Sequence, residues 1–234
     1  MRSSRHAEKI EVTAIRSSHE LFRNYLSLKY RIFVEELGWQ LPSNHRLGLA
    51  DTDSYDSHST LYIACCSDDG NPIGIFRATP IQPAIFPYSG LLKKYLSPEK
   101  LSISRDKICV LTSLAVQPPW RGRAVSFRGE QLTAAKCLLW TVIDDIRNSG
   151  LEACLLTAVQ GVSVAFFQHA GAYRLAEQYI LPNFSVQVRD LVILVNDCER
   201  FAELNSYLRL SCKPRALNNA ELTSQWYLRR RDRT

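Results

Sequence analysis

The first part of the chain changes from strand-like to helix-like spacing of its apolar residues. Apolar and polar side chains alternate over 10–15, which predicts an opening strand. Apolar positions three and four apart then predict a helix over 21–38. Ser17 or Ser18 is expected to cap this helix, and Gly38 to end it.

Two apolar runs, 60–66 and 73–78, flank the sequence Asp68-Asp69-Gly70-Asn71-Pro72. Turn residues between two strand-like runs predict a hairpin. Residues 80–106 interrupt the pattern, and we interpret them as an insertion that contains a short helix over 91–96. The continuous apolar run 108–116 is typical of a central, buried strand.

Pro118 and Pro119 end that strand, and the loop Trp120-Arg121-Gly122-Arg123-Ala124 is expected to lead into a long helix that ends at Gly150. The remaining pattern predicts strand 154–158, helix 162–169, strands 173–180 and 187–195, and helix 197–208. The order β-α-β-β-(insertion)-β-α-β-α-β-β-α predicts an α/β (α+β) fold in which helices flank a mixed sheet.

The composition of the 234 residues, with 46% hydrophobic and 22% charged, is that of an ordinary globular chain. Its longest apolar stretches are far shorter than the roughly 20 residues that a bilayer span needs. The polar, basic start shows no secretory signal. The seven cysteines are odd in number and lack metal-ligand spacing. We therefore expect a cytoplasmic protein with reduced thiols, no metal site and no stable membrane insertion.

The net charge of +6 is concentrated near the C-terminus. From Arg209 onward there are seven basic residues against Glu221 and Asp232, which leaves 22 of the 29 basic and 21 of the 23 acidic residues in the first 208. A nearly neutral body without a basic stripe does not favour nucleic-acid binding. We predict one domain over 1–208 and a basic tail over 209–234, which either meets an acidic or phosphate-bearing partner or only aids solubility.

The strand 108–116, the Arg-Gly-Arg loop and the helix after it resemble the acyltransferase fold of the Gcn5-related N-acetyltransferases (GNAT). The resemblance implies a central mixed, mostly antiparallel sheet and an acyl thioester substrate. In such a loop, backbone N–H groups and a helix N-terminus attract a phosphate. Ala124 and Ser126 occupy the two small positions of the family pattern, so its first glycine is missing. The implied donor-binding residues are Leu114, Ala115, Val116, Arg121, Gly122, Arg123 and Ala124.

A second set of motifs resembles the acyl-homoserine-lactone synthases and the related N-acyl amino acid synthases, a branch of the same superfamily. Lys29, Phe33 and Trp39 have the family spacing of a basic residue, a phenylalanine and a tryptophan. Asp53-Ser54-Tyr55-Asp56 matches an Asp-x-x-Asp element, and Gly74-Ile75-Phe76-Arg77 matches a strand that carries an arginine. The match extends from about Leu21 to Gly171. It implies substrate-binding roles for Lys29, Phe33, Trp39, Asp56 and Arg77.

Each of these residues also has a structural interpretation. Phe33 and Trp39 are typical of a core, and Asp53 and Asp56 suit a turn. Arg77 within an apolar strand needs a partner, because a buried charge is costly unless it is paired. We expect Asp53 or Asp56 to pair with Arg77. In the family that these motifs resemble, such pairs pin the mobile loop over the donor cleft, and the resemblance implies the same here.

Two departures from the family bear on the chemistry. The family's central strand carries Glu-x-Ser-Arg where this chain has Val110-Leu111-Thr112-Ser113, so the acid and the arginine are absent. Generic acetyltransferases often supply a tyrosine as general acid in the short helix, where this chain has Phe167. The first departure favours an acceptor other than S-adenosylmethionine.

Acyl transfer from a thioester requires oriented reactants, N–H groups for the oxyanion and a group that takes an amine proton. The backbone of 114–116 would supply the N–H groups in this fold. The candidate catalytic residues are Thr112, Ser113, Glu36 and Asp53, with Glu35 and Asp56 as further candidate bases. The sequence does not choose among them.

The sequence thus predicts an N-acyltransferase that moves a fatty acyl group from acyl carrier protein or acyl-CoA to a primary amine of an amino acid or peptide, such as a lysine or ornithine side chain. No permanently bound cofactor is expected. The alternatives are an acyl-homoserine-lactone (autoinducer) synthase that uses S-adenosylmethionine and a catalytically inactive binding module. Arg121, Arg123 and Arg128 would suit an acidic carrier, but both donors share the phosphopantetheine arm.

Overall fold

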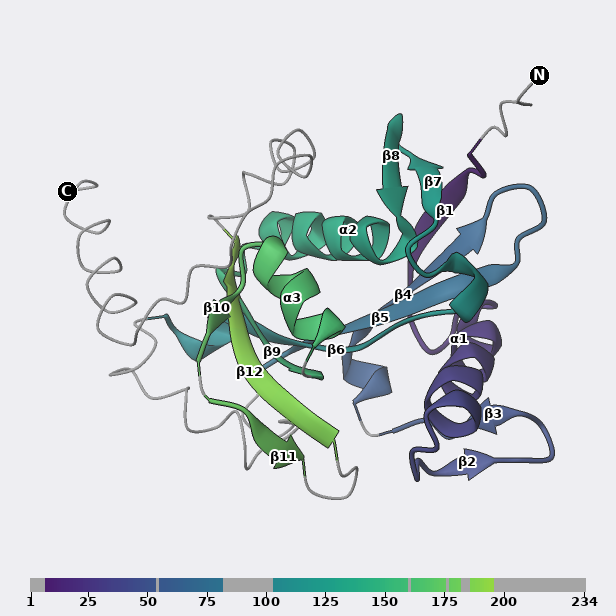
Figure 1. Ribbon diagram of the computed structural model, residues 1–234, viewed down its shortest axis with the longest axis horizontal. Coiled ribbons are helices and arrows are strands. Elements are labelled where there is room, and N and C mark those ends of the chain that lie inside the picture. The colour runs from purple at the N-terminus through teal and green to yellow at the C-terminus, as the bar shows by residue number, and fades with distance from the viewer. Residues whose placement is uncertain are drawn as a thin grey trace.

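An eight-stranded sheet forms the centre of the fold, in the order β1-β4-β5-β6-β9-β12-β10 with β11 beside β12 (Figure 1). The computed structural model describes residues 7–53, 55–81, 103–159, 161–175, 177–181 and 186–195. The helices expected over 91–96 and 197–208, most of the insertion and the basic tail lie outside these residues. The mixed, mostly antiparallel sheet with flanking helices confirms the fold class.

The strands of the central sheet pair antiparallel, except that β6 and β9 run parallel. Helix α2 (Ala134–Asn148) lies between these two strands in the chain and provides the crossover that a parallel pair requires. The strand bounds are β1 Ile10–Ile15, β4 Thr60–Cys66, β5 Pro72–Pro80, β6 Ile108–Val116, β9 Ala153–Val159, β10 Tyr173–Arg174, β11 Tyr179–Leu181 and β12 Val186–Leu194. Two small hairpins, β2 (Ser43–Asn44) with β3 (Leu49–Ala50) and β7 (Ala124–Phe127) with β8 (Glu130–Thr133), stand apart from this sheet.

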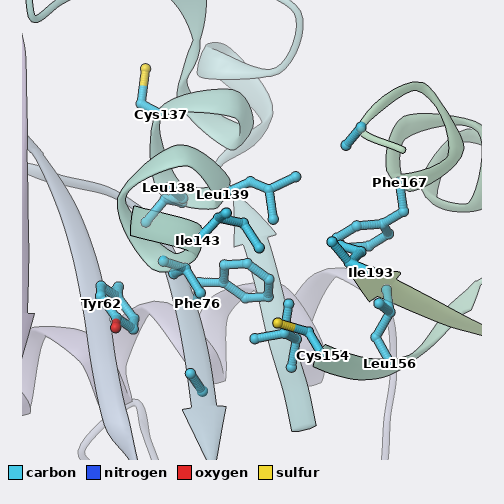
Figure 2. Close-up of a cluster of buried hydrophobic side chains, with 14 of the residues drawn as sticks. Tyr62, Phe76, Cys137, Leu138, Leu139, Ile143, Cys154, Leu156, Phe167 and Ile193 are labelled. Atoms are coloured by element: carbon cyan, nitrogen blue, oxygen red, sulfur yellow. The ribbon is translucent and has the colours of Figure 1, made fainter. Parts of the chain in front are cut away.

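Helices cover both faces of the sheet (Figure 1). On one face, α2 and α3 (Val162–His169) pack over the largest apolar cluster. Figure 2 shows Leu138 and Ile143 of α2 and Phe167 of α3 around Phe76 of β5. On the other face, α1 (Phe22–Lys29) packs over a second cluster. The sheet is therefore the middle layer of three.

The first helix differs from its prediction in two respects. Its α-helical part begins at Phe22, and Leu21 precedes it without a side-chain cap, so the expected capping by Ser17 or Ser18 is wrong. The last turns, Tyr30–Glu36, are π-helical. The helix ends before Gly38 as expected, and this glycine has a φ of +66°, which side chains disfavour.

The largest correction concerns the path from β6 to α2. The sequence predicts that the Arg-Gly-Arg loop enters the helix directly, but the β7–β8 hairpin lies between them. Arg128 and Gly129 form its two-residue turn, both with positive φ (50° and 84°). Such a turn normally carries Asn-Gly or Asp-Gly, so Arg128-Gly129 is not a strong turn signal.

The remaining elements follow the predicted pattern closely. The expected strands over 10–15 and 108–116 and the helix over 162–169 have the observed bounds, whereas the strand expected over 173–180 is divided into β10 and β11. Within the described residues, none of the five cysteines forms a disulfide. No helix among them is long and apolar enough to cross a lipid bilayer.

Candidate functional site

β6 and β9 part near the middle of the sheet and leave a cavity of about 630 Å³. Their pairing runs from Ile108 with Ala153 to Leu111 with Leu156 and then stops, although both strands continue. The diverging strand ends line the cavity together with the start of α2, α3, the end of the first helix and residues 51–53. The cavity therefore opens at Thr112, on the strand where the acyl donor was expected.

β6 carries an irregularity beside the cavity. In the pairing with β5, Arg77 faces Thr112 and Ile75 faces Ala115, so Ser113 and Leu114 both lie opposite the single residue Phe76. Ser113 has a φ of +58°, which is uncommon for a residue with a side chain. A bulge of this kind interrupts the ladder and leaves backbone polar groups unpaired. Ser113 and Leu114, the two residues of this bulge, both line the cavity.

Arg77 is the centre of a cluster of four charged side chains. Its Nη1 donates to Asp53 Oδ2 (2.6 Å) and Asp56 Oδ1 (2.9 Å), which is the pairing expected from the sequence. Lys29 Nζ lies 3.3 Å from Asp53 Oδ2 and 3.7 Å from Asp56 Oδ2. Lys29, Asp56 and Arg77 are buried, at 1–6% exposure. Two cations and two carboxylates balance, as a buried charge cluster requires.

The cluster fixes the polar loop that carries both aspartates. The backbone N–H groups of Tyr55 and Asp56 donate to Asp53 Oδ1 (3.0 and 3.1 Å). Burial would raise the pKa of Asp53, but the neighbouring Arg77 and Lys29 cations and these hydrogen bonds hold that pKa below its usual range. A carboxylate so stabilised in its charged form is a weak proton acceptor. Its bonding thus suits a positioning role better than that of a general base.

Thr112 joins the charge cluster to the cavity. The Nε of Arg77 donates to Thr112 Oγ1 at 2.8 Å, and Thr112 lines the cavity with Ser113. Because a guanidinium has only donors, the hydroxyl proton of Thr112 remains available to a ligand. Both candidate catalytic residues of β6 therefore line the cavity.

The first helix presents its motif residues to the same cavity. Lys29, Phe33 and Leu37 all line it, because π-helical turns bring residues four to five apart onto one side. The rings of Phe33 and Trp39 stack with centroids 5.0 Å apart, and Trp39 also lines the cavity. The pair thus packs within an apolar cluster and also forms part of the cavity wall.

Glu36 lies apart from the cavity and is bound by Arg121. Arg121 Nη2 donates to Glu36 Oε2 (2.7 Å), Nη1 contacts Oε1, and Nε donates to the carbonyl of Val116 (2.7 Å). The hydrogen bonds from Arg121 lower the pKa of Glu36. Arg121 lines the cavity but Glu36 does not, so this pair joins the first helix to the end of β6 at the cavity rim.

The expected donor loop is only partly at the cavity. Arg121 and Gly122 line it, whereas Arg123 and Ala124 do not. Arg123 Nη2 lies 3.0 Å from Glu8 Oε1, and Arg128 Nη1 lies 2.8 Å from Asp144 Oδ2. Arg123 precedes the β7–β8 hairpin and Arg128 lies in its turn; neither lines the cavity, and each is paired with a carboxylate.

Several lining residues escaped the sequence analysis. Lys136, in the first turn of α2, lines the cavity and has no ion pair among the described residues; burial lowers its pKa. Asp51 also lines the cavity and has no ion pair in the described part of the chain. Thr157 of β9 lines it too and donates to Asp190 of β12. Lys136 could have been found from its place at the start of a helix, but the other two depend on the folded arrangement.

The two departures from the family pattern are real features of this cavity. Val110, in place of the glutamate, is buried in an apolar cluster, and Phe167, in place of the tyrosine, lines the cavity. Neither side chain can transfer a proton.

Residues 28–128 match the family model described as "Acetyltransferase (GNAT) domain". Among curated proteins, the acyl-homoserine-lactone synthase of Acinetobacter nosocomialis is 35% identical over 63 residues, which is 27% of this chain and 33% of the relative. The synthase of Aliivibrio fischeri is 34% identical over 61 residues, 26% of this chain and 30% of the relative. The chain is therefore similar to a GNAT acetyltransferase domain over residues 28–128 and, over a shorter segment, to the acyl-homoserine-lactone synthases, a branch of that superfamily. The matched segment spans about one third of the length of these curated relatives.

Solved structures of this branch share the fold across most of the chain. The CoA-dependent acyl-homoserine lactone synthase BjaI, solved with SAM and isopentyl-CoA, has a TM-score of 0.64 at 15% identity, covering 90% of this chain and 96% of BjaI. TofI, solved in a ternary complex with an inhibitor and MTA, has a TM-score of 0.61 at 18% identity, covering 84% and 96%. FeeM, an N-acyl amino acid synthase from uncultured soil microbes, has a TM-score of 0.56 at 10% identity, covering 81% and 94%.

Proposed function

We propose that the chain is an N-acyltransferase that joins the acyl group of a thioester to a primary amine. The observation that carries this proposal is the cavity at the opening of β6 and β9, with the bulge of β6 on one wall and the Arg77 cluster beside it. A pantetheine arm needs an extended channel between strands, and an acyl chain needs apolar walls. Phe33, Phe76 and Phe166 are among the side chains that provide such walls.

For the donor, Lys136 and the start of α2 support a phosphate-bearing thioester. The N-terminus of a helix attracts anions, and Lys136 adds a full charge that the described residues do not neutralise. Acyl-CoA and acyl carrier protein both carry a phosphate on the pantetheine arm, so this site serves either donor. Arg121 can add a second cation where it reaches the cavity rim.

We propose S-adenosylmethionine as the first candidate for the acceptor amine. The similarity to acyl-homoserine-lactone synthases supports this alternative over the amino acid or peptide favoured by the sequence. Asp51 also supports it, because a carboxylate without an ion pair among the described residues suits a cationic acceptor.

An amino acid is the second candidate acceptor. Val110 supports it, since the acid of the lactone-synthase pattern is missing from β6. The likeness in fold to an N-acyl amino acid synthase is consistent with this second candidate.

In the proposed reaction, the neutral amine attacks the thioester carbonyl and a C–N bond forms. Negative charge develops on the carbonyl oxygen, and backbone N–H groups of the bulge, with the Thr112 hydroxyl, stabilise it. The C–S bond then breaks and the thiol leaves. The residues contribute orientation and hydrogen bonds to an already activated acyl group.

The test is a matrix of donors and acceptors. Hexanoyl-, octanoyl- and decanoyl-CoA and the same chains on acyl carrier protein are each incubated with S-adenosylmethionine, with single amino acids and with a lysine peptide. Thiol release and mass spectrometry of products are measured. The proposal predicts thiol release that depends on an amine. With S-adenosylmethionine the expected product is an N-acyl-homoserine lactone, which forms when the carboxylate of the acylated S-adenosylmethionine attacks its own γ-carbon and methylthioadenosine leaves. Thioester binding without release with every amine would instead support an inactive binding module.

A further inference from the structure

Two threonines face the point at which the sheet opens. Leu111 and Leu156 are the last paired residues of β6 and β9, and the next residue on each strand is a threonine, Thr112 and Thr157. Both line the cavity. Because side chains alternate between the two faces of a strand, corresponding residues of paired strands point to the same face. The two hydroxyls therefore flank the same end of the cavity.

The two hydroxyls have opposite hydrogen-bonding roles. Thr112 Oγ1 accepts from Arg77 Nε, so its proton is available. Thr157 Oγ1 donates to Asp190 Oδ1 at 2.8 Å, so its proton is engaged. The Thr157 hydroxyl also interacts with Tyr179, and of its two lone pairs one can still accept from a ligand in the cavity. One threonine thus offers a donor to the cavity and the other offers an acceptor. The thioester oxygen needs the first, and the attacking amine needs the second.

Asp190 is the carboxylate behind Thr157. It is fully buried, at 0% exposure, on β12, and Tyr179 of β11 donates to the same Oδ1 at 2.7 Å. Burial raises the pKa of Tyr179, so its hydroxyl stays a proton donor to Asp190. The hydroxyls of Thr157 and Tyr179 thus both donate to the same carboxylate oxygen, and of these three residues Thr157 is the one that lines the cavity.

The other candidate carboxylates are arranged differently. Asp53 and Asp56 bind Arg77 and Lys29, and Glu36 binds Arg121. A proton would have to compete with these cations before any of the three carboxylates could accept it. Asp190 connects to the cavity through the Thr157 hydroxyl, and it lies on β12 rather than at the Val110 position of β6.

We propose that Thr157 accepts the proton of the acceptor amine and passes its own proton to Asp190. As the C–N bond forms, the N–H proton moves to Thr157 Oγ1 while the Thr157 proton moves to Asp190 Oδ1. When the C–S bond breaks, the proton returns by the same route to the leaving sulfur. The products are an amide and a thiol, and Thr157 and Asp190 are regenerated. This inference rests on the proposed acyl transfer and adds its proton path.

The test compares Thr157→Val, Thr157→Ser and Asp190→Asn. Steady-state rates are measured with the acyl-CoA and amine that the wild type uses, and binding of the acyl-CoA is measured separately. Thr157→Val should lower kcat about 100-fold with little change in acyl-CoA Kd, because general-base catalysis contributes on the order of 10²–10⁴. Thr157→Ser, which keeps the hydroxyl, should restore kcat to within about 3-fold. Asp190→Asn should lower kcat without raising the KM of either substrate.

Thr141→Val is the matched control. Thr141 is a buried threonine of α2 whose hydroxyl bonds the Cys137 carbonyl, and it does not line the cavity. Loss of the Thr141 hydroxyl should leave kcat near the wild-type value. Thermal unfolding of each variant identifies any that fails to fold. Wild-type kcat in Thr157→Val, or equal losses in kcat and acyl-CoA binding, would overturn the proton path alone. A wild type that turns over no amine would overturn the proposed function and the path together.

Discussion

Arg77 contacts Thr112 and Asp53 through different nitrogens, with Nε donating to the hydroxyl at 2.8 Å and Nη1 to the carboxylate at 2.6 Å. One buried side chain thus holds both the cavity wall and the loop that covers it. Displacement of this side chain should therefore disturb the loop and the wall together.

Arg77→Met should destabilise the protein by about 3–5 kcal/mol, the usual effect of removing one partner from a buried ion pair. Asp56 would be left buried beside Lys29 alone. Urea unfolding measures the loss. Arg77→Lys, which keeps the charge but loses the fork of donors, serves as the control and should lose less. Equal midpoints for Arg77→Met and the wild type would contradict the role of the cluster.

Thr112→Val should slow acyl transfer more than it weakens thioester binding. The change removes a hydrogen-bond donor from the carbonyl site and leaves Arg77 Nε unpaired, which costs about 1–3 kcal/mol. The comparison is kcat against acyl-CoA Kd, with Thr112→Ser as the variant that keeps the hydroxyl. Parallel losses in both quantities would assign Thr112 to binding instead.

Gly74→Ala should destabilise the fold by about 1–3 kcal/mol through overpacking. An added Cβ would lie 2.9 Å from Leu138 Cδ1 and 3.2 Å from the Ala115 carbonyl oxygen. Leu138→Ala in the same chain would relieve the first contact. The double variant should therefore lose less stability than the two single losses added together, as measured by a double-mutant cycle. Additive losses would show that the contact with Leu138 is not the cause.

The stability of the charge cluster should decrease in acid. The pKa of Asp53 is lower in the folded chain than the value of about 3.9 expected in the unfolded chain. Its contribution is therefore complete above about pH 4 and is lost as the pH falls through the folded value. Asp53→Asn should remove this part of the acid sensitivity in urea unfolding between pH 5 and pH 2.5. Asp51→Asn, in the same loop but exposed, should keep it.

The ion pair between Arg121 and Glu36 should contribute little to stability, because both side chains are partly exposed, at 44% and 30%. A double-mutant cycle with Arg121→Met and Glu36→Gln should give a coupling of about 1 kcal/mol or less. The coupling should fall further in 1 M salt, which screens exposed charges. A salt-insensitive coupling of several kcal/mol would show that the pair is closed off from solvent.

The sequence predicted those parts of the site that depend on a local pattern of residues or on the free-energy cost of burying an unpaired charge. The strand over 108–116 followed from its continuous apolar run, and the pairing of Arg77 with an aspartate followed from the cost of an unpaired buried charge. The hairpin before α2 was missed because Arg128-Gly129 is not a typical turn pair.

Thr157 and Asp190 were missed for another reason. Their contact depends on β12 lying beside β9, and the order of strands in a sheet is not encoded in either segment alone. The bulge at Ser113 likewise depends on pairing with β5. A single sequence therefore does not predict contacts that depend on the order of strands in the sheet.

Because β6 and β9 separate at the cavity, the width of the cavity depends partly on how α2 packs on the sheet. The two strands are held together only at one end, and α2 rests across the sheet at the other, with Leu138 in contact range of Gly74. Since the start of α2 also lines the cavity, the packing of this helix on the sheet bears on the width of the opening. A change in side-chain volume beneath α2 should therefore change the width of the cavity. The set of acyl chains that fit should change with it, although the residues that touch the substrate stay the same.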